Sequence, residues 1–177
     1  MTRRKLLRRV FILCCHCLRN LAFYRAGWSN GELILHNDFW ITVNGNFMDI
    51  CVLEWCKLFA DPRGKHYWKK VISNLSVFSQ GLLQELGISE QELCAYINEV
   101  RDYRDKFVAH LDQDEVMTPP VLEVIKNSTS CLYDFLLNHE DEGGYFTNAP
   151  AKSATLFLSS ETQKAELVYG MGSGIRS

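Results

Sequence analysis

The chain has 177 residues and a formal net charge of −2, with 47% hydrophobic and 23% charged residues. This length is sufficient for one ordinary domain with a buried core, and the composition excludes an intrinsically disordered chain. The small net charge also excludes the overall excess of positive charge that is typical of nucleic-acid-binding proteins.

Charge is unevenly distributed along the chain. Seven basic residues and no acidic residue precede Glu32, whereas eight acidic residues and one basic residue, Lys126, lie between Asp112 and Glu142. A basic end of this kind suits RNA, a membrane surface or the acidic segment of the same chain, and the sequence does not choose among the three.

The seven cysteines, an odd number, fall mostly within apolar helical patterns. They predict buried thiols in a reducing, cytoplasmic compartment. The run Cys14-Cys15-His16-Cys17 also suggests metal ligands, but no second CxxC or HxxxH pair completes a tetrahedral site. Helix packing is therefore favoured, and we expect neither a metal nor another cofactor.

The apolar run that follows the basic N-terminus is too short to span a membrane, so no membrane partner is expected.

Apolar spacing predicts three amphipathic helices in the first half of the chain. The first covers residues 4–26 and is followed by a turn at residues 29–31. The second covers residues 37–59, although Asn44-Gly45 within it is also a hairpin signal. The helix is favoured because the three-and-four spacing of apolar residues continues past that signal. The third covers residues 65–86.

The second half begins with a strong helix start. Ser89 followed by Glu92 is a capping box, in which the serine side chain and the glutamate side chain each satisfy a free backbone amide. It predicts a fourth helix from Ser89 to about Leu111. Thr118 with two following prolines predicts a fifth helix that continues to about Asn138.

Beyond residue 142 the chain becomes rich in Gly, Ser, Thr and Ala. The sequence therefore predicts an all-α fold, an antiparallel bundle of four to five helices over residues 1–142. Residues 143–177 are predicted to form a loosely structured tail with weak strand-like runs at 155–158 and 166–169.

The fourth helix contains the strongest candidate site. Arg104 occupies a position where the apolar stripe calls for a hydrophobic residue, and a guanidinium there needs an anionic partner. His110 follows six residues later and titrates near neutral pH. The two side chains point about 120° apart on an ideal helix, so they are expected to line a groove rather than to touch. Asp105 and Asp112 supply nearby carboxylates, either of which could orient the imidazole or pair with the guanidinium.

This arrangement resembles the HEPN superfamily, whose motif is an arginine, a polar residue and then a histidine late on a long helix. Arg104 is followed by Asp105, and five residues separate Arg104 from His110. The similarity is greatest to the branch associated with bacterial abortive infection, and it covers about Leu6 to Asn138. It implies a homodimeric, metal-independent endoribonuclease in phage defence or a toxin–antitoxin setting, with RNA as substrate and a cognate antitoxin or defence-system protein as partner.

The resemblance also implies roles for individual residues. His110 would act as general base or acid, Arg104 would stabilise charge on the phosphate, and Asp105 would position one of them. Four further basic residues would bind backbone phosphates without reading sequence: Lys106, Arg101, Arg8 and Arg19. A two-fold dimer would bring both copies of the motif into one cleft.

A structural interpretation explains the same residues without catalysis. His110 lies near a helix C-terminus, where the helix dipole and Asp112 favour a protonated imidazole. Arg104 would then pair with an acidic residue of a neighbouring helix, for which Glu54 is the candidate. The competing hypothesis is a non-catalytic helical interaction or regulatory module.

Overall fold

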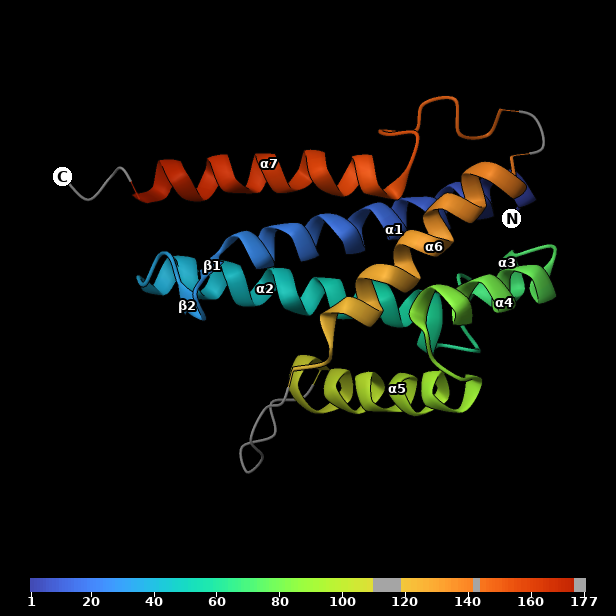
Figure 1. Ribbon diagram of the computed structural model, residues 1–177, viewed down its shortest axis with the longest axis horizontal. Coiled ribbons are helices and arrows are strands. Elements are labelled where there is room, and N and C mark those ends of the chain that lie inside the picture. Colours follow the sequence, from blue (N-terminus) through green and yellow to red (C-terminus); the bar gives the residue numbers. More distant parts are fainter. Residues whose placement is uncertain (110–118, 142–143, 174–177) are drawn as a thin grey trace.

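The computed structural model describes residues 1–109, 119–141 and 144–173. Within these ranges the chain is mainly α-helical, as predicted, and its one sheet is a hairpin of two short antiparallel strands, β1 (Trp28–Ser29) and β2 (Glu32–Leu33) (Figure 1). The helical elements are α1 (Arg3–Ala26), α2 (Asp38–Trp55), η1 (Cys56–Ala60), α3 (Trp68–Val71), α4 (Leu75–Leu86), α5 (Glu90–Tyr103), η2 (Arg104–Ala109), α6 (Leu122–His139) and α7 (Ala154–Ser173), of which η1 and η2 are π-helical. None of the described helices combines the length and apolarity that crossing a bilayer requires.

Helices α1 and α2 form the centre of the fold. They are antiparallel, since Cys17 contacts Cys51 while Tyr24 contacts Asn44. In Figure 1, α7 lies on one side of this pair and α5 on the other, and α6 crosses the pair obliquely. Consequently, a side chain on the α1–α7 side does not share a surface with one at the end of α5.

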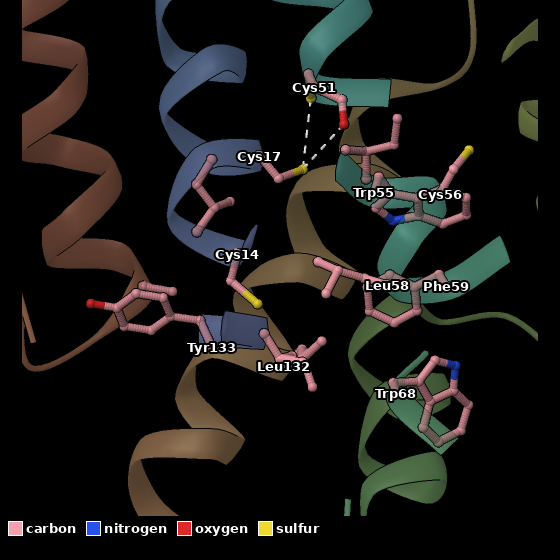
Figure 2. Packing of buried hydrophobic residues seen from close by; sticks show 14 of the residues in the cluster. Cys14, Cys17, Cys51, Trp55, Cys56, Leu58, Phe59, Trp68, Leu132 and Tyr133 are labelled. Atoms are coloured by element: carbon pink, nitrogen blue, oxygen red, sulfur yellow. Dashed lines mark hydrogen bonds between the residues drawn. The ribbon is translucent and has the colours of Figure 1, made fainter. Parts of the chain in front are cut away.

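The core is a layer of cysteine, aromatic and aliphatic side chains between α1, α2, η1 and α6. Figure 2 shows Cys14, Cys17, Cys51 and Cys56 packed among Trp55, Phe59 and Leu132. These cysteines are buried, as predicted, with 3.8 Å between the Sγ atoms of Cys17 and Cys51, whereas Cys94 is exposed and Cys131 is half-buried. The buried cysteines act as small hydrophobic residues. No group of three or more metal-ligating side chains occurs within the described ranges.

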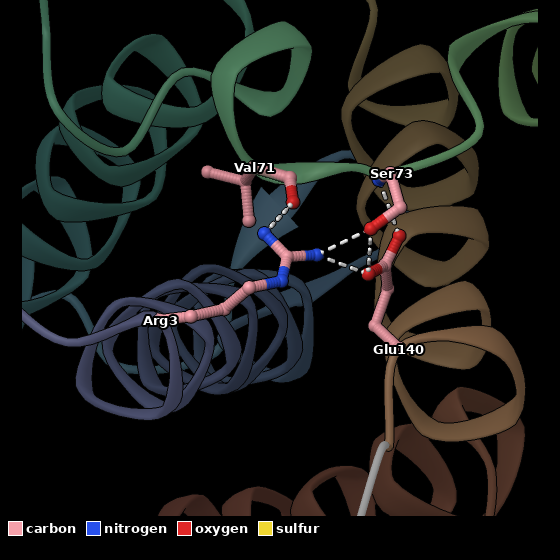
Figure 3. Close-up of polar contacts among 4 residues, drawn as sticks. All are labelled: Arg3, Val71, Ser73 and Glu140. Carbon is pink, nitrogen blue, oxygen red and sulfur yellow. Dashed lines mark hydrogen bonds and ion pairs between the residues drawn. The ribbon is translucent and has the colours of Figure 1, made fainter.

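A polar cluster joins three elements at one end of the fold. We call Arg3, Ser73 and Glu140 the Arg3 clasp (Figure 3). Glu140 is only 1% exposed, and its carboxylate accepts hydrogen bonds from the Arg3 guanidinium, from Ser73 N at 2.6 Å and from Ser73 Oγ at 2.9 Å. The clasp connects the start of α1 to the α3–α4 link and to the end of α6. Because the buried carboxylate is fully paired, it stabilises this junction.

Several predicted helix boundaries are confirmed. The second segment is helical through Asn44, whose buried side chain bonds to Trp28 Nε1 and Tyr169 Oη rather than forming a turn. The capping box at the start of α5 is also present, with 3.2 Å from Glu92 N to Ser89 Oγ and 2.7 Å from Ser89 N to a Glu92 carboxylate oxygen.

Other boundaries differ from the prediction. The third segment is two helices, because Asn74 caps a new helix, α4, after the chain leaves α3 at Val71. Helix α5 ends at Tyr103, where the chain enters the π-helical turn η2. Helix α6 begins at Leu122 rather than at Thr118, which lies outside the described residues. Pro119 is disfavoured in a helical conformation because a second proline follows it, so the helix begins only after both prolines.

The prediction of a loosely structured tail is wrong for residues 154–173, which form α7. Its buried face repeats every four residues, with Phe157, Glu161, Ala165 and Tyr169 all facing the fold. The strand-like runs at 155–158 and 166–169 are turns of this helix. Helix α7 runs parallel to α1, since Arg19 contacts Glu161 and Gly27 lies against Tyr169. The fold is therefore not a purely antiparallel bundle.

Candidate functional site

The candidate site lies where α5 passes into η2. Arg104 is the first residue of η2, directly after Tyr103, the last residue of α5. A π-helical turn has an i→i+5 hydrogen-bond pattern, and such turns occur frequently at functional sites because they displace side chains from the regular helical positions. The Arg104 side chain is 24% exposed, so it is neither buried in the core nor free in solvent.

Arg104 is paired with Asp105, its neighbour in the chain. Its Nε donates to Asp105 Oδ1 at 2.8 Å, and its Nη2 lies 2.7 Å from the same oxygen. Burial acts to lower the pKa of Arg104, but the hydrogen bond to Asp105 and the charges of Asp105 and Asp61 raise it above its usual value. The guanidinium therefore remains charged, and the contact occupies one edge of its planar fork.

The pairing of Arg104 with Glu54 does not occur. Glu54 instead lies 3.1 Å from Lys57 Nζ and 4.0 Å from His16 Nδ1. Arg104 lies beside Cys56, the first residue of η1. Burial raises the pKa of Cys56 to about 12, and the nearby Arg104 charge only partly opposes this rise. The Cys56 thiol therefore stays protonated at neutral pH and is not a nucleophile of this site.

The remaining predicted site residues fall into two groups. Arg101 is exposed on the last turn of α5 and Lys106 is half-buried in η2, so both are at the same helix end as Arg104. His110, the predicted general base, and Asp112 lie outside the described residues.

Arg8 and Arg19 are not part of this group. Both lie on α1, and Arg19 faces α7, with 2.7 Å from its Nε to Glu161 Oε2. Since α7 and α5 lie on opposite sides of the α1–α2 pair, one protomer does not place these two arginines beside Arg104 (Figure 1).

A cavity of about 200 Å³ lies between Tyr103 and α2, and the sequence interpretation missed it. We call it the Tyr103 cavity, after the residue that precedes Arg104; its walls include Tyr24, Trp28, Asp49 and Tyr103. Burial raises the pKa of Tyr103 to about 12 and also raises the pKa of Asp49. Aromatic side chains around a small cavity suit the stacking of a nucleobase. The available sequence signal was the tyrosine next to the arginine of the motif.

Searches of protein-family models, curated proteins and solved structures found no match to this chain. Membership of the HEPN superfamily therefore stays a prediction from the spacing of Arg104 and His110. The chemistry of the site is inferred from its own residues, which are a charged guanidinium held on one edge, an exposed carboxylate and a neighbouring aromatic cavity.

Proposed function

We propose that the chain is a HEPN-type, metal-independent endoribonuclease that acts as a homodimer in phage defence or a toxin–antitoxin setting. The observation that carries this proposal is the charge and the partial exposure of the Arg104 guanidinium. Its guanidinium is charged and partly exposed at the end of a helix, six residues before His110, and Asp105 holds only one edge of it. A cognate antitoxin or defence-system protein is the partner that this function implies.

The proposed chemistry needs no metal. His110 accepts the proton of a ribose 2′-hydroxyl, and the 2′-oxygen forms a bond to the adjacent phosphorus. The bond from phosphorus to the 5′-oxygen then breaks, that oxygen takes a proton from water as it leaves, and His110 returns its proton to the solvent. Arg104 stabilises the negative charge that builds on the non-bridging oxygens, because the donors of a guanidinium match the spacing of phosphate oxygens.

Three neighbouring features support RNA as the substrate. Arg101 and Lys106 add positive charge beside Arg104, which favours contact with backbone phosphates. The Tyr103 cavity offers aromatic walls to a base next to the phosphate that Arg104 would hold. Asp105 fixes the orientation of the guanidinium before the substrate arrives, which lowers the cost of ordering it in the transition state.

The direct test is cleavage of single-stranded RNA by the purified full chain in the presence of EDTA. The parent should cut, and His110→Ala should cut about 10²–10⁴-fold more slowly, the usual contribution of a general acid or base. His36→Ala, which removes an exposed histidine outside the site, is the matched control and should retain the parent rate. If the parent leaves RNA intact as a monomer and as a dimer, the nuclease proposal fails.

The second candidate function is a non-catalytic interaction module. It is favoured by exposed apolar side chains near the meeting point of α2 and α7, where Trp40 packs on Tyr169 while Phe39, Leu167 and Met171 are mostly exposed. Patches of this kind often contact another protein. An uncleaved RNA substrate together with loss of a partner protein on Phe39→Ser would favour this function over the nuclease.

A further inference from the structure

A second cavity, of about 260 Å³, lies between α1 and the chain segment 145–150 that leads toward α7. We call it the α1 cavity. Its apolar surface comes from Phe11, Ile12, Phe146 and Ala149. The rings of Phe11 and Phe146 are in contact, with centroids 4.8 Å apart, so the floor is rigid and aromatic. The volume is that of a ligand with a single ring rather than of an extended polymer.

The rim of the α1 cavity is basic. Arg8, His16 and Arg19 reach it from one face of α1, and none of its lining residues in the described chain is acidic. Glu161 accepts a hydrogen bond from Arg19 Nε on the α7 side, where the guanidinium also lies over the Phe157 ring, 5.8 Å from its centroid. Glu54 is the acidic residue near His16, at 4.0 Å, and it is shared with Lys57.

We propose that the α1 cavity binds a compact phosphate monoester that carries one aromatic ring, the class to which nucleoside monophosphates belong. The Arg8 guanidinium at the rim matches the charge and the oxygen geometry of a phosphate dianion, and Arg19, about 16 Å farther along α1, adds positive charge at the other end of the cavity. The aromatic floor matches the ring. This site goes beyond the proposed nuclease activity and does not depend on it, because Arg8 and Arg19 are remote from Arg104.

The thiol in the cavity is compatible with an anionic ligand. Cys15 lines the α1 cavity, and burial raises its pKa to about 12, against the opposing effect of Arg19. The thiol is therefore neutral at physiological pH and does not repel a phosphate. Binding is expected to be non-covalent, with the ring on Phe11 and Phe146 and the phosphate on Arg8.

The test is calorimetric titration of the full chain with phenyl phosphate, compared with inorganic phosphate and with phenol. Phenyl phosphate should bind at least about tenfold more tightly than either fragment, because only it engages both the rim and the floor. Equal affinities for phenyl phosphate and inorganic phosphate would overturn the proposal, since the cavity floor would then contribute nothing. Absence of binding at millimolar phenyl phosphate would overturn it as well.

Substitutions at the rim and inside the α1 cavity test where phenyl phosphate binds. Arg8→Gln should weaken phenyl phosphate binding roughly tenfold, whereas the matched control Arg63→Gln, in an exposed loop, should leave it unchanged. Arg8 is exposed and has no ion pair with another described residue, so its loss should not disturb folding. Ala149→Phe, which fills the cavity without altering charge, should also abolish binding. Equal weakening by Arg8→Gln and Arg63→Gln would place the phosphate elsewhere and contradict the proposal.

Discussion

Arg19 on the α1–α7 side and Arg104 at the end of α5 are both held on one edge by a carboxylate, but the two carboxylates lie in different surroundings. Glu161 is 4% exposed and comes from another helix, whereas Asp105 is 55% exposed and is the next residue in the chain. Removing the partner of a buried charge costs several kcal/mol, and an exposed pair contributes about 1 kcal/mol or less. The Arg19 pair therefore joins two helices, while the Arg104 pair adds little to the fold.

This difference teaches how to distinguish a structural arginine from a functional one. Where a guanidinium joins two distant elements through a buried acid, as Arg19 does through Glu161, the contribution of the ion pair to the stability of the fold explains why the arginine is there. Arg104 is partly buried and charged, and among the described residues its ion pair is with its neighbour in the chain. Stability does not explain such a position, which is why we propose a ligand there.

The largest effect is expected at Arg104, the proposed functional arginine. Arg104→Gln keeps the length and polarity of the side chain but removes its charge, so RNA cleavage should fall about 10²–10³-fold, as when one donor to a developing oxyanion is lost. The free energy of unfolding should change by less than about 1 kcal/mol, because the Asp105 partner is exposed. Cleavage rates and urea unfolding curves check the two parts, with Arg63→Gln as control. A rate equal to that of the parent would show that Arg104 has no part in the chemistry.

The second effect concerns the Arg3 clasp, where the acid is buried. Arg3→Ala should lower the free energy of unfolding by about 3 kcal/mol, because Glu140 would keep only Ser73 as a partner. Arg25→Ala is the matched control: it breaks an ion pair whose acid, Glu123, is exposed, and should cost about 1 kcal/mol or less. Equal losses in the two variants would remove the distinction between buried and exposed pairs.

The third effect tests how closely α1, α2 and α7 approach one another. A Cβ atom at Gly27 would lie 2.2 Å from Asn44 Nδ2 and 2.7 Å from Tyr169 Oη. Gly27→Ala should therefore destabilise the protein by about 2 kcal/mol through overpacking. Gly81→Ala, in α4 with open space around it, should instead stabilise by up to about 1 kcal/mol. Thermal unfolding of both variants measures the difference, and a stable Gly27→Ala protein would show that α7 is not tightly packed.

The smallest effect is a pH dependence at the α1–α7 contact. Burial acts to raise the pKa of Glu161, but the hydrogen bonds from Lys164 and Arg19 hold it below its usual value. A carboxyl group with a lowered folded-state pKa stabilises the protein above its unfolded pKa of about 4.3, and this stabilisation is lost as the pH falls through the folded pKa. Glu161→Gln should therefore show a shallower loss of stability below about pH 4.3 than the parent. Parallel acid unfolding curves would contradict this.

The sequence predicted those elements whose signals are local. The capping box places Ser89 at the start of α5, and the apolar spacing of residues 38–55 outweighs the Asn44-Gly45 turn signal because Asn44 finds buried partners. The π-helical turns were not predicted, since their i→i+5 bonds leave no distinct residue pattern.

Helix α7 was missed because composition concealed its pattern. Phe157, Ala165 and Tyr169 share one face with Glu161, and the glutamate interrupts the apolar pattern of that face. Its partner, Arg19, lies on α1, far away in the sequence, so the pairing is visible only in the structure. For the same reason the partner of Arg104 was assigned to Glu54. Side-chain pairing across helices depends on their arrangement in space, which a single sequence does not contain. The Arg104–Asp105 pair is local, and the sequence did offer Asp105 as a partner of the guanidinium.

The most direct test compares Arg104→Gln with Glu161→Gln in the same two assays, RNA cleavage in EDTA and thermal unfolding. We expect Arg104→Gln to lose about 100-fold or more of the cleavage rate at an unchanged unfolding midpoint, and Glu161→Gln to unfold at a lower temperature with the cleavage rate retained. If Arg104→Gln lowers the midpoint as much as Glu161→Gln and leaves cleavage unaffected, the arginine at η2 is structural and the account is contradicted.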